Sequence, residues 1–237
     1  MKLVSPAVWH YADNMDIEIR ELAPSLIEDY LGFFDSQAFT DHEDWSYCYC
    51  TSFNIEDEAD KETDEAFAAS GRDVKVLQQL QKATARRLIE EGKLTGYLAY
   101  VDDQPVAFCN ARDKAVCQRF HWNAELDPFI RASGTGKVMI VACFIVAPEF
   151  RNRGVASALM SRVIADAKEQ GYDAVEGYPR LTEEHEKFDY TGPKHLFEKY
   201  GFEPVASKSV VSEEVWGNGC RIMRKELSGP ELSGLSQ

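Results

Sequence analysis

The feature that most constrains the fold is an apolar run from Val138 to Ala147, followed by a proline, a basic turn and a helical pattern. Because this run is unbroken and rich in β-branched residues, it predicts a strand buried on both faces. Past Pro148, apolar residues recur at helical spacing until Gly171, which predicts a helix that ends there. The segment therefore predicts a central strand, a turn and an amphipathic helix in direct succession.

The turn between this strand and this helix has the chemistry of an anion site. It reads Arg151-Asn152-Arg153-Gly154 and lies where the helix begins. A helix N-terminus presents unpaired backbone N–H groups and the positive end of the helix dipole. Gly154 lets the backbone approach a phosphate because it has no Cβ. The turn therefore predicts a diphosphate site.

These residues resemble the signature of the GNAT acyltransferase superfamily, Arg/Gln-x-x-Gly-x-Gly/Ala, which Arg151, Gly154 and Ala156 fill. Residues 196–202 are similar to the second motif of that family, and residues 96–111 read as its hairpin. An ordinary strand–turn–helix with a basic turn is the alternative. The resemblance implies an α/β (α+β) GNAT fold: a mixed, mostly antiparallel central sheet flanked by helices, with splayed fourth and fifth strands.

A chain of 237 residues is long enough for one well-buried domain with insertions. We expect a single GNAT-like domain over residues 14–226, preceded by an N-terminal extension, residues 1–13. A helical insertion is expected near 55–92 and a loop insertion near 113–136. The Gly/Ser-rich end of the chain, residues 227–237, is expected to be a flexible tail.

Other elements follow from periodicity and from turn residues. Expected strands cover 17–20, 95–101, 105–111, 174–178, 203–211 and 219–226, and expected helices cover 24–38, 73–91 and 193–200.

Composition excludes several classes of function. The formal net charge of −14 argues against nucleic acid, which needs a basic surface. The charge is compatible with a cationic amine substrate, or it serves only solubility. The longest apolar run is too short for a membrane span, and nothing at residues 1–11 resembles a signal peptide. The six cysteines lack a disulfide or zinc spacing, so we expect a cytoplasmic protein with reduced thiols.

The resemblance implies that the co-substrate is acetyl-CoA. Its pantetheine arm is expected to pair with the backbone of Phe144, Ile145 and Val146. Its diphosphate is expected on the turn and the first helical residues, Arg151, Asn152, Arg153, Gly154, Val155, Ala156 and Ser157.

The resemblance also suggests candidates for proton transfer. Glu176 lies where many members place a glutamate on the fifth strand, so it is the candidate general base, acting through water. The usual tyrosine acid is replaced by Phe197, which has no proton to give, and Tyr200 is interpreted as core packing. Tyr190 stands where many members have a cofactor-contacting asparagine and could reach the sulfur. Protonation of the thiolate by water is the alternative.

The aromatic and cysteine-rich stretch from 41 to 54 is the candidate acceptor pocket, with Asp41, Trp45, Tyr47 and Cys50 as lining residues. Packing of this loop over the core is the alternative. Cys48 and Cys50, even with His42, make a poor zinc site, so we expect no metal.

Two functions from different classes follow. The first is an N-acetyltransferase that passes an acetyl group to a primary amine by direct attack in a ternary complex; a small-molecule amine is favoured over a protein amine. The second is a catalytically silent acyl-CoA-binding module, which the missing tyrosine at Phe197 keeps open. No nucleic acid or membrane partner is expected, and a homodimer is left open.

Overall fold

The computed structural model describes residues 7–10, 15–54, 57–117, 127–179, 190–205 and 221–227. Within them an eight-stranded sheet has the order β1-β2-β3-β4-β5-β6-β8-β7. Neighbouring strands are antiparallel except β5 and β6, which are parallel. The strands are β1 Ala7–His10, β2 Asp16–Glu21, β3 Gly96–Val101, β4 Gln104–Asp113, β5 Val138–Val146, β6 Ala174–Gly177, β7 Glu203–Pro204 and β8 Met223–Glu226.

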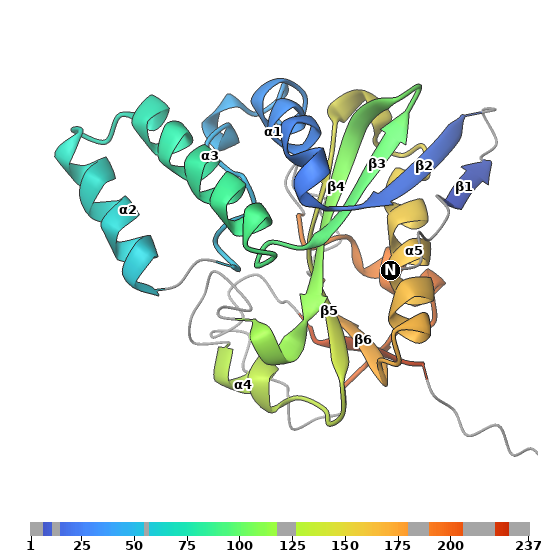
Figure 1. The fold of residues 1–237 in the computed structure, drawn as a ribbon. Helices are drawn as coiled ribbons and strands as arrows, with labels where there is room; N and C mark the ends of the chain where they lie inside the picture. Colours follow the sequence, from blue (N-terminus) through green and yellow to red (C-terminus); the bar gives the residue numbers. More distant parts are fainter. Residues whose placement is uncertain are drawn as a thin grey trace, which may run out of the picture.

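Helices cover both faces of the sheet. Figure 1 shows α1 and α3 on one side of the sheet and α5 on the other, with α2 packed outside α3. The helices are α1 Ile27–Ser36, α2 Asp57–Ala69, α3 Val74–Glu90, α4 Asp127–Ala132, α5 Val155–Glu169 and α6 Lys194–Lys199. The predicted mixed, mostly antiparallel sheet flanked by helices is confirmed.

Alternation along the strands divides the core into two main layers. Met139, Val141 and Phe144 of β5 face α5 and α6. Ala142, Cys143 and Ile145 face the layer that contains α1 and α3. Because β5 is buried on both faces from end to end, its sequence has no polar alternation.

The turn between β3 and β4 follows from two aspartates. Asp102 and Asp103 both have positive φ, 50° and 59°, as a two-residue type I′ hairpin turn requires. The hairpin pairs β3 with β4, and the other edge of β4 pairs with β5, where Cys109 lies opposite Phe144.

The structure adds detail at both ends of the chain and in the second insertion. Residues 7–10, within the expected N-terminal extension, form β1 and pair with β2. The insertion near 113–136 contains the short helix α4. The expected terminal strands are described only at β7 and β8. Of the expected flexible tail, 227–237, the structure describes Leu227 alone, whose N–H donates to the carbonyl of Asp173 at 2.8 Å.

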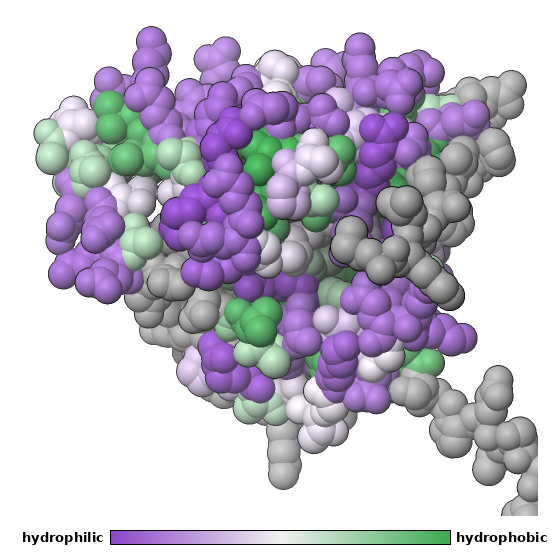
Figure 2. All heavy atoms as spheres, viewed as in Figure 1, coloured by the Kyte–Doolittle hydropathy of each residue, from purple (hydrophilic) through white to green (hydrophobic). Residues whose placement is uncertain are grey.

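The surface seen in Figure 2 is largely hydrophilic, in keeping with the many charged residues. A hydrophobic group of atoms lies at the upper left, where α2 meets α3 in Figure 1. Val74, at the start of α3, is 46% exposed.

Candidate active site

The parallel pair β5–β6 separates part-way along β5. The register runs from Val138 opposite Ala174 to Val141 opposite Gly177. Strand β5 then continues to Val146 without β6 beside it. The family resemblance places the pantetheine arm of acetyl-CoA on the edge of this second half of β5, from Ala142 to Val146.

Two backbone groups of this edge are bonded within the chain. The N–H of Phe144 donates to the carbonyl oxygen of Tyr190 at 2.6 Å. The carbonyl of Val146 accepts a hydrogen bond from Nε of Arg151 at 3.1 Å. The first of these contacts ties the segment that leads into α6 to β5.

The turn before α5 has the backbone conformation expected of a phosphate cradle. Gly154 is the N-cap of α5 with φ 89°, and Asn152 has φ 60°. Ala158 donates to the carbonyl of Gly154 at 2.9 Å, so the helix starts directly at the turn. The N–H groups of the first helical turn have no acceptor within the helix, which makes this end of α5 suitable for an anion.

The guanidinium of Arg151 is paired with a carboxylate of the same chain. It forms a bidentate pair with Asp41, with N–O distances of 2.6 and 3.2 Å. The hydrogen bond from Arg151 lowers the pKa of Asp41. The pair therefore connects the turn before α5 to the loop that follows α1.

A cavity of about 440 Å³ lies against the same half of β5. Trp45, Tyr47 and Cys50, three of the four residues expected in an acceptor pocket, line it; Asp41 is not among the lining residues. Cys143, Ile145 and Gln81 were not foreseen, although alternation along β5 could have indicated the first two. The lining consists of Phe39, Trp45, Tyr47, Cys48, Tyr49, Cys50, Thr51, Ser52, Phe53, Gln81, Cys143, Ile145 and Tyr190.

Three thiols meet at this cavity. The sulfur atoms of Cys50 and Cys143 lie 3.2 Å apart, and both residues are free cysteines. The hydrogen bond between the two thiols raises the pKa of Cys50, while burial raises the pKa of Cys143. The hydrogen bond with Cys50, together with burial, raises the pKa of Cys48. All three thiols therefore stay protonated, and uncharged, at neutral pH.

Glu176 is fully buried on β6 and held by two cations. Lys114 Nζ donates to Oε2 at 2.7 Å, and Arg224 Nη1 donates to Oε1 at 2.8 Å. Ser133 Oγ lies 3.3 Å from Oε2. Burial lowers the pKa of Lys114, and Glu176 partly offsets this. Both oxygens already accept charged hydrogen bonds, so the catalytic role of Glu176 stays a prediction.

A family profile decides the relationship of the chain to known proteins. The profile described as Acetyltransferase (GNAT) family matches residues 25–202, which include β3 to β6, the turn before α5 and the segment at Tyr190. The chain belongs to the GNAT acetyltransferase family.

Solved structures are similar to this chain over most of its length. The GNAT domain of S. lividans PAT is 13% identical, with a TM-score of 0.51 over 95% of this chain and 99% of that one. A putative GNAT acetyltransferase from Desulfovibrio desulfuricans is 14% identical, covering 90% and 99%, with a TM-score of 0.48. The aminoglycoside N-acetyltransferase AAC(6')-Iy in complex with CoA is 14% identical, covering 89% and 97%, with a TM-score of 0.45. No curated protein sequence matches significantly.

Three aromatic residues of this GNAT chain bear on which group could protonate the leaving thiolate. Phe197 is fully buried and packs edge-on against Phe202, with ring centroids 5.2 Å apart. Tyr200 donates to the carbonyl of Ser157 at 2.7 Å and so links α6 to α5. Tyr190 lines the aromatic cavity, with its ring 6.3 Å from that of Trp45. Of the three, only Tyr190 lies at both β5 and the cavity.

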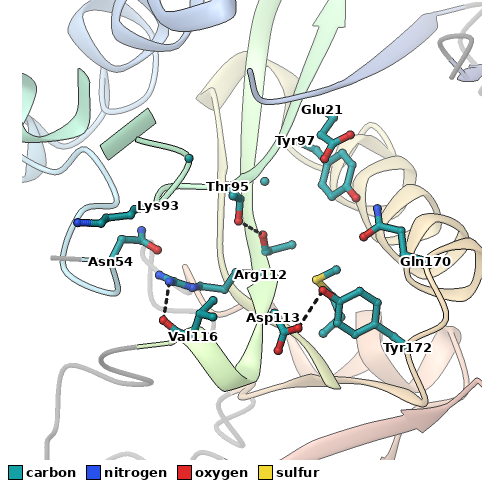
Figure 3. A pocket seen from close by; sticks show the side chains of 14 residues that line it. Glu21, Asn54, Lys93, Thr95, Tyr97, Arg112, Asp113, Val116, Gln170 and Tyr172 are labelled. Atoms are coloured by element: carbon teal, nitrogen blue, oxygen red, sulfur yellow. Dashed lines mark hydrogen bonds between the residues drawn. The ribbon is translucent and has the colours of Figure 1, made fainter. Parts of the chain in front are cut away.

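A second cavity of about 440 Å³ lies toward the opposite end of β5, where Met139 is among its lining residues. Figure 3 shows Arg112 on one side of it and Tyr172 on the other. Asp113 accepts a hydrogen bond from the Tyr172 hydroxyl at 3.3 Å, and burial raises the pKa of Tyr172 to about 12. This GNAT domain therefore has a polar cavity apart from the aromatic one.

The described residues contain neither a metal-binding group nor a membrane-spanning helix. No three His, Cys, Asp or Glu side chains are grouped there in a way that could hold a metal ion. None of the helices in the described ranges is long and apolar enough to cross a membrane.

Proposed function

We propose that this protein transfers an acetyl group from acetyl-CoA to the primary amine of a small molecule, by direct attack in a ternary complex. The observation that carries the proposal is the position of the aromatic cavity against β5. Cys143 and Ile145 line the cavity on either side of Phe144, whose N–H lies on the strand edge. Because adjacent Cα atoms are about 3.8 Å apart, an acceptor there lies close to an acyl group held on this edge.

The residues of the expected cofactor site suit acetyl-CoA. The turn at Gly154 and the first turn of α5 offer backbone N–H groups to a diphosphate. Phe144, Ile145 and Val146 offer a strand edge to the pantetheine arm. When bound, acetyl-CoA supplies an activated acyl group as a thioester.

The chain's own residues position the acceptor. The cavity volume of about 440 Å³ falls in the range of small-molecule sites, roughly 300–1,000 Å³. Its aromatic walls offer flat faces on which an acceptor can be oriented. Tyr190 lines the cavity with its side chain and meets β5 with its carbonyl, and its phenol is the candidate donor of a proton to the leaving thiolate.

A silent acyl-CoA-binding module is the second candidate. The buried Phe197, in place of the family's tyrosine, favours it because that ring has no proton to donate. Both candidates need the turn at Gly154, so cofactor binding does not separate them.

We also propose a cellular compartment, a domain extent and a set of partners for this protein. Buried free thiols such as Cys50 and Cys143 are suited to a reducing compartment, and we propose the cytoplasm. We also propose residues 14–226 as one domain, with β1 added at its edge, and no nucleic-acid or membrane partner. The oligomeric state, including a homodimer, is to be measured by sedimentation.

Release of free thiol from acetyl-CoA over a panel of amines tests the function. Transfer predicts amine-dependent release and an acetylated product detectable by mass spectrometry. Tight binding of acetyl-CoA without release on any amine would favour the silent module. Failure to bind acetyl-CoA at all would contradict both candidates.

A further inference from the structure

The aromatic cavity carries no charged side chain among its described lining residues. Its polar groups are the hydroxyls of Thr51, Ser52 and the tyrosines, the amide of Gln81 and three thiols. The Thr51 hydroxyl donates to the side-chain oxygen of Gln81. These groups can bond a neutral amine, but none of them balances the charge of an ammonium ion.

The three thiols of the lining and the phenols of Tyr47 and Tyr49 stay neutral at physiological pH. Burial raises the pKa of Tyr47, as it does for Cys143. The pKa of Tyr49 is also raised, by burial and by its hydrogen bond to Asp35. Among the described residues that line the cavity, none is a negative group that a cationic amine could pair with.

Two carboxylates that come before the lining loop in the chain, Asp35 and Asp41, are already paired. Asp35 accepts from Lys82 at 2.5 Å and from the Tyr49 hydroxyl at 2.5 Å. Asp41 is held by Arg151. Neither carboxylate can be turned toward the cavity without leaving a cation unpaired.

The walls present flat aromatic faces. The rings of Trp45 and Tyr47 lie within 14° of parallel with centroids 6.4 Å apart, and the ring of Tyr190 is tilted by 41° against that of Trp45. Aromatic rings favour stacked and edge-to-face contact with another ring. The shape and chemistry of the cavity therefore suit a planar, apolar body.

We propose that the acceptor is an arylamine, in which the amino group is attached directly to an aromatic ring and is uncharged at neutral pH. This inference rests on the acetyl transfer proposed above and names its substrate class. An alkylammonium ion would lose hydration in a cavity whose described lining offers no counter-charge, which is strongly unfavourable. An arylamine already has a free lone pair, so it does not require a carboxylate base beside it.

The transfer balances without a further reactant. The lone pair of the arylamine nitrogen forms a C–N bond to the acetyl carbonyl carbon, and the C–S bond of the thioester breaks. The sulfur leaves with the electron pair of that bond. The proton lost by the nitrogen reaches the thiolate, through water or Tyr190, so the products are an N-aryl acetamide and free CoA.

Aniline and cyclohexylamine form the test pair because both carry one amino group on a six-membered carbon ring. We expect the wild-type protein to use aniline with a kcat/KM at least tenfold higher than cyclohexylamine or spermidine at neutral pH. A preference for cyclohexylamine or spermidine would overturn the arylamine assignment while leaving acetyl transfer intact.

Gln81→Glu provides the sharper test, since it places a carboxylate of nearly the same shape in the lining. It should shift the ratio of kcat/KM for aniline to that for cyclohexylamine at least tenfold toward cyclohexylamine. Gln79→Glu is the matched control: the same substitution on the same helix, at an exposed position. An equal shift in both variants would show that overall charge, and not the cavity, sets the preference.

Calorimetric titration of the two amines separates the two proposals. One outcome is that no amine is acetylated, yet aniline binds at least tenfold more tightly than cyclohexylamine and Gln81→Glu removes this difference. That outcome would support the arylamine assignment of the cavity and would contradict the proposed acetyl transfer. If the two amines bind equally, the arylamine assignment fails whatever the turnover.

Discussion

The carbonyl oxygen of Tyr190 accepts a 2.6 Å hydrogen bond from the N–H of Phe144, on the edge of β5 that β6 has left. The family resemblance implies that this N–H pairs with the pantetheine arm of acetyl-CoA. Tyr190 also lines the aromatic cavity with its side chain. One residue therefore touches both proposed sites, and an acyl donor that takes the Phe144 N–H must displace the Tyr190 carbonyl.

Hydrogen exchange should report this displacement. On adding acetyl-CoA, amides in the segment 190–193 should exchange faster, because the segment loses its bond to β5, while the amide of Phe144 should stay protected by its new partner. Exchange followed by mass spectrometry at peptide resolution measures both. Slower exchange at 190–193 together with unchanged exchange on β5 would show that the donor binds without displacing Tyr190.

Gly154→Asp should weaken acetyl-CoA binding at least tenfold, about 1.4 kcal/mol. The variant forces a side chain onto a backbone with φ 89° and puts a carboxylate at the expected diphosphate site. Isothermal titration measures the affinity.

Gly171→Asp is the control for this variant. Gly171 also has positive φ, 70°, and lies just past the other end of α5, where a Cβ would meet no atom within 4 Å. It carries a comparable backbone strain far from the turn, so acetyl-CoA affinity should stay near wild type. Equal losses in both variants would attribute the effect to strain and remove the diphosphate assignment.

Local signals predicted most of the fold. The apolar run of β5, the aspartates of the β3–β4 turn and Gly171 after α5 each determine the backbone around them through side-chain burial or positive φ. Strand β1 was not expected, because four residues such as Ala7–His10 have too short a pattern, and only their pairing with β2 defines them.

The site was predictable to a lesser extent, because its contacts join residues far apart in the chain. The loop of Trp45, Tyr47 and Cys50 was recognised from composition, but nothing local to Asp41 indicates that Arg151 binds it. The same holds for Glu176, whose partners come from the ends of β4 and β8. Charge pairing across a sheet depends on register, which a single sequence does not specify.

The buried thiols should make the protein less stable at alkaline pH. The folded-state pKa values of Cys48, Cys50 and Cys143 are raised, so the folded chain keeps protons that the unfolded chain releases above its ordinary thiol pKa, about 8.5. Their contribution to stability is complete below that pH and is lost as pH rises above it. Each thiol contributes a slope of up to about 1.4 kcal/mol per pH unit.

Urea unfolding at several pH values between about 7.5 and 9.5, around the thiol range, measures this slope. Cys143→Ala should give a shallower fall than wild type because one buried thiol is gone. Identical slopes for the variant and the wild type would contradict the assignment of the pH dependence to this cluster.

Glu176→Gln should destabilise the fold by about 3–5 kcal/mol, because it leaves Lys114 buried without its negative partner and leaves Arg224 only the exposed Glu226. Adding Lys114→Met should recover part of this loss, since the buried cation without a partner is removed. Urea unfolding of the single and double variants gives both free energies. An unchanged stability in the single variant would mean that the ion pairs do not support the fold.

The same variant decides the predicted role of Glu176 in proton transfer. General base catalysis typically contributes about 10²–10⁴-fold, so loss of a base should lower kcat by at least tenfold on a cationic amine, with partial recovery at high pH. Acetyl-CoA affinity, measured on the folded fraction, should then stay near wild type. If the variant is less stable but keeps a wild-type kcat on that amine, Glu176 serves the buried ion pairs alone. The base for cationic amines would then have to lie elsewhere around the cavity.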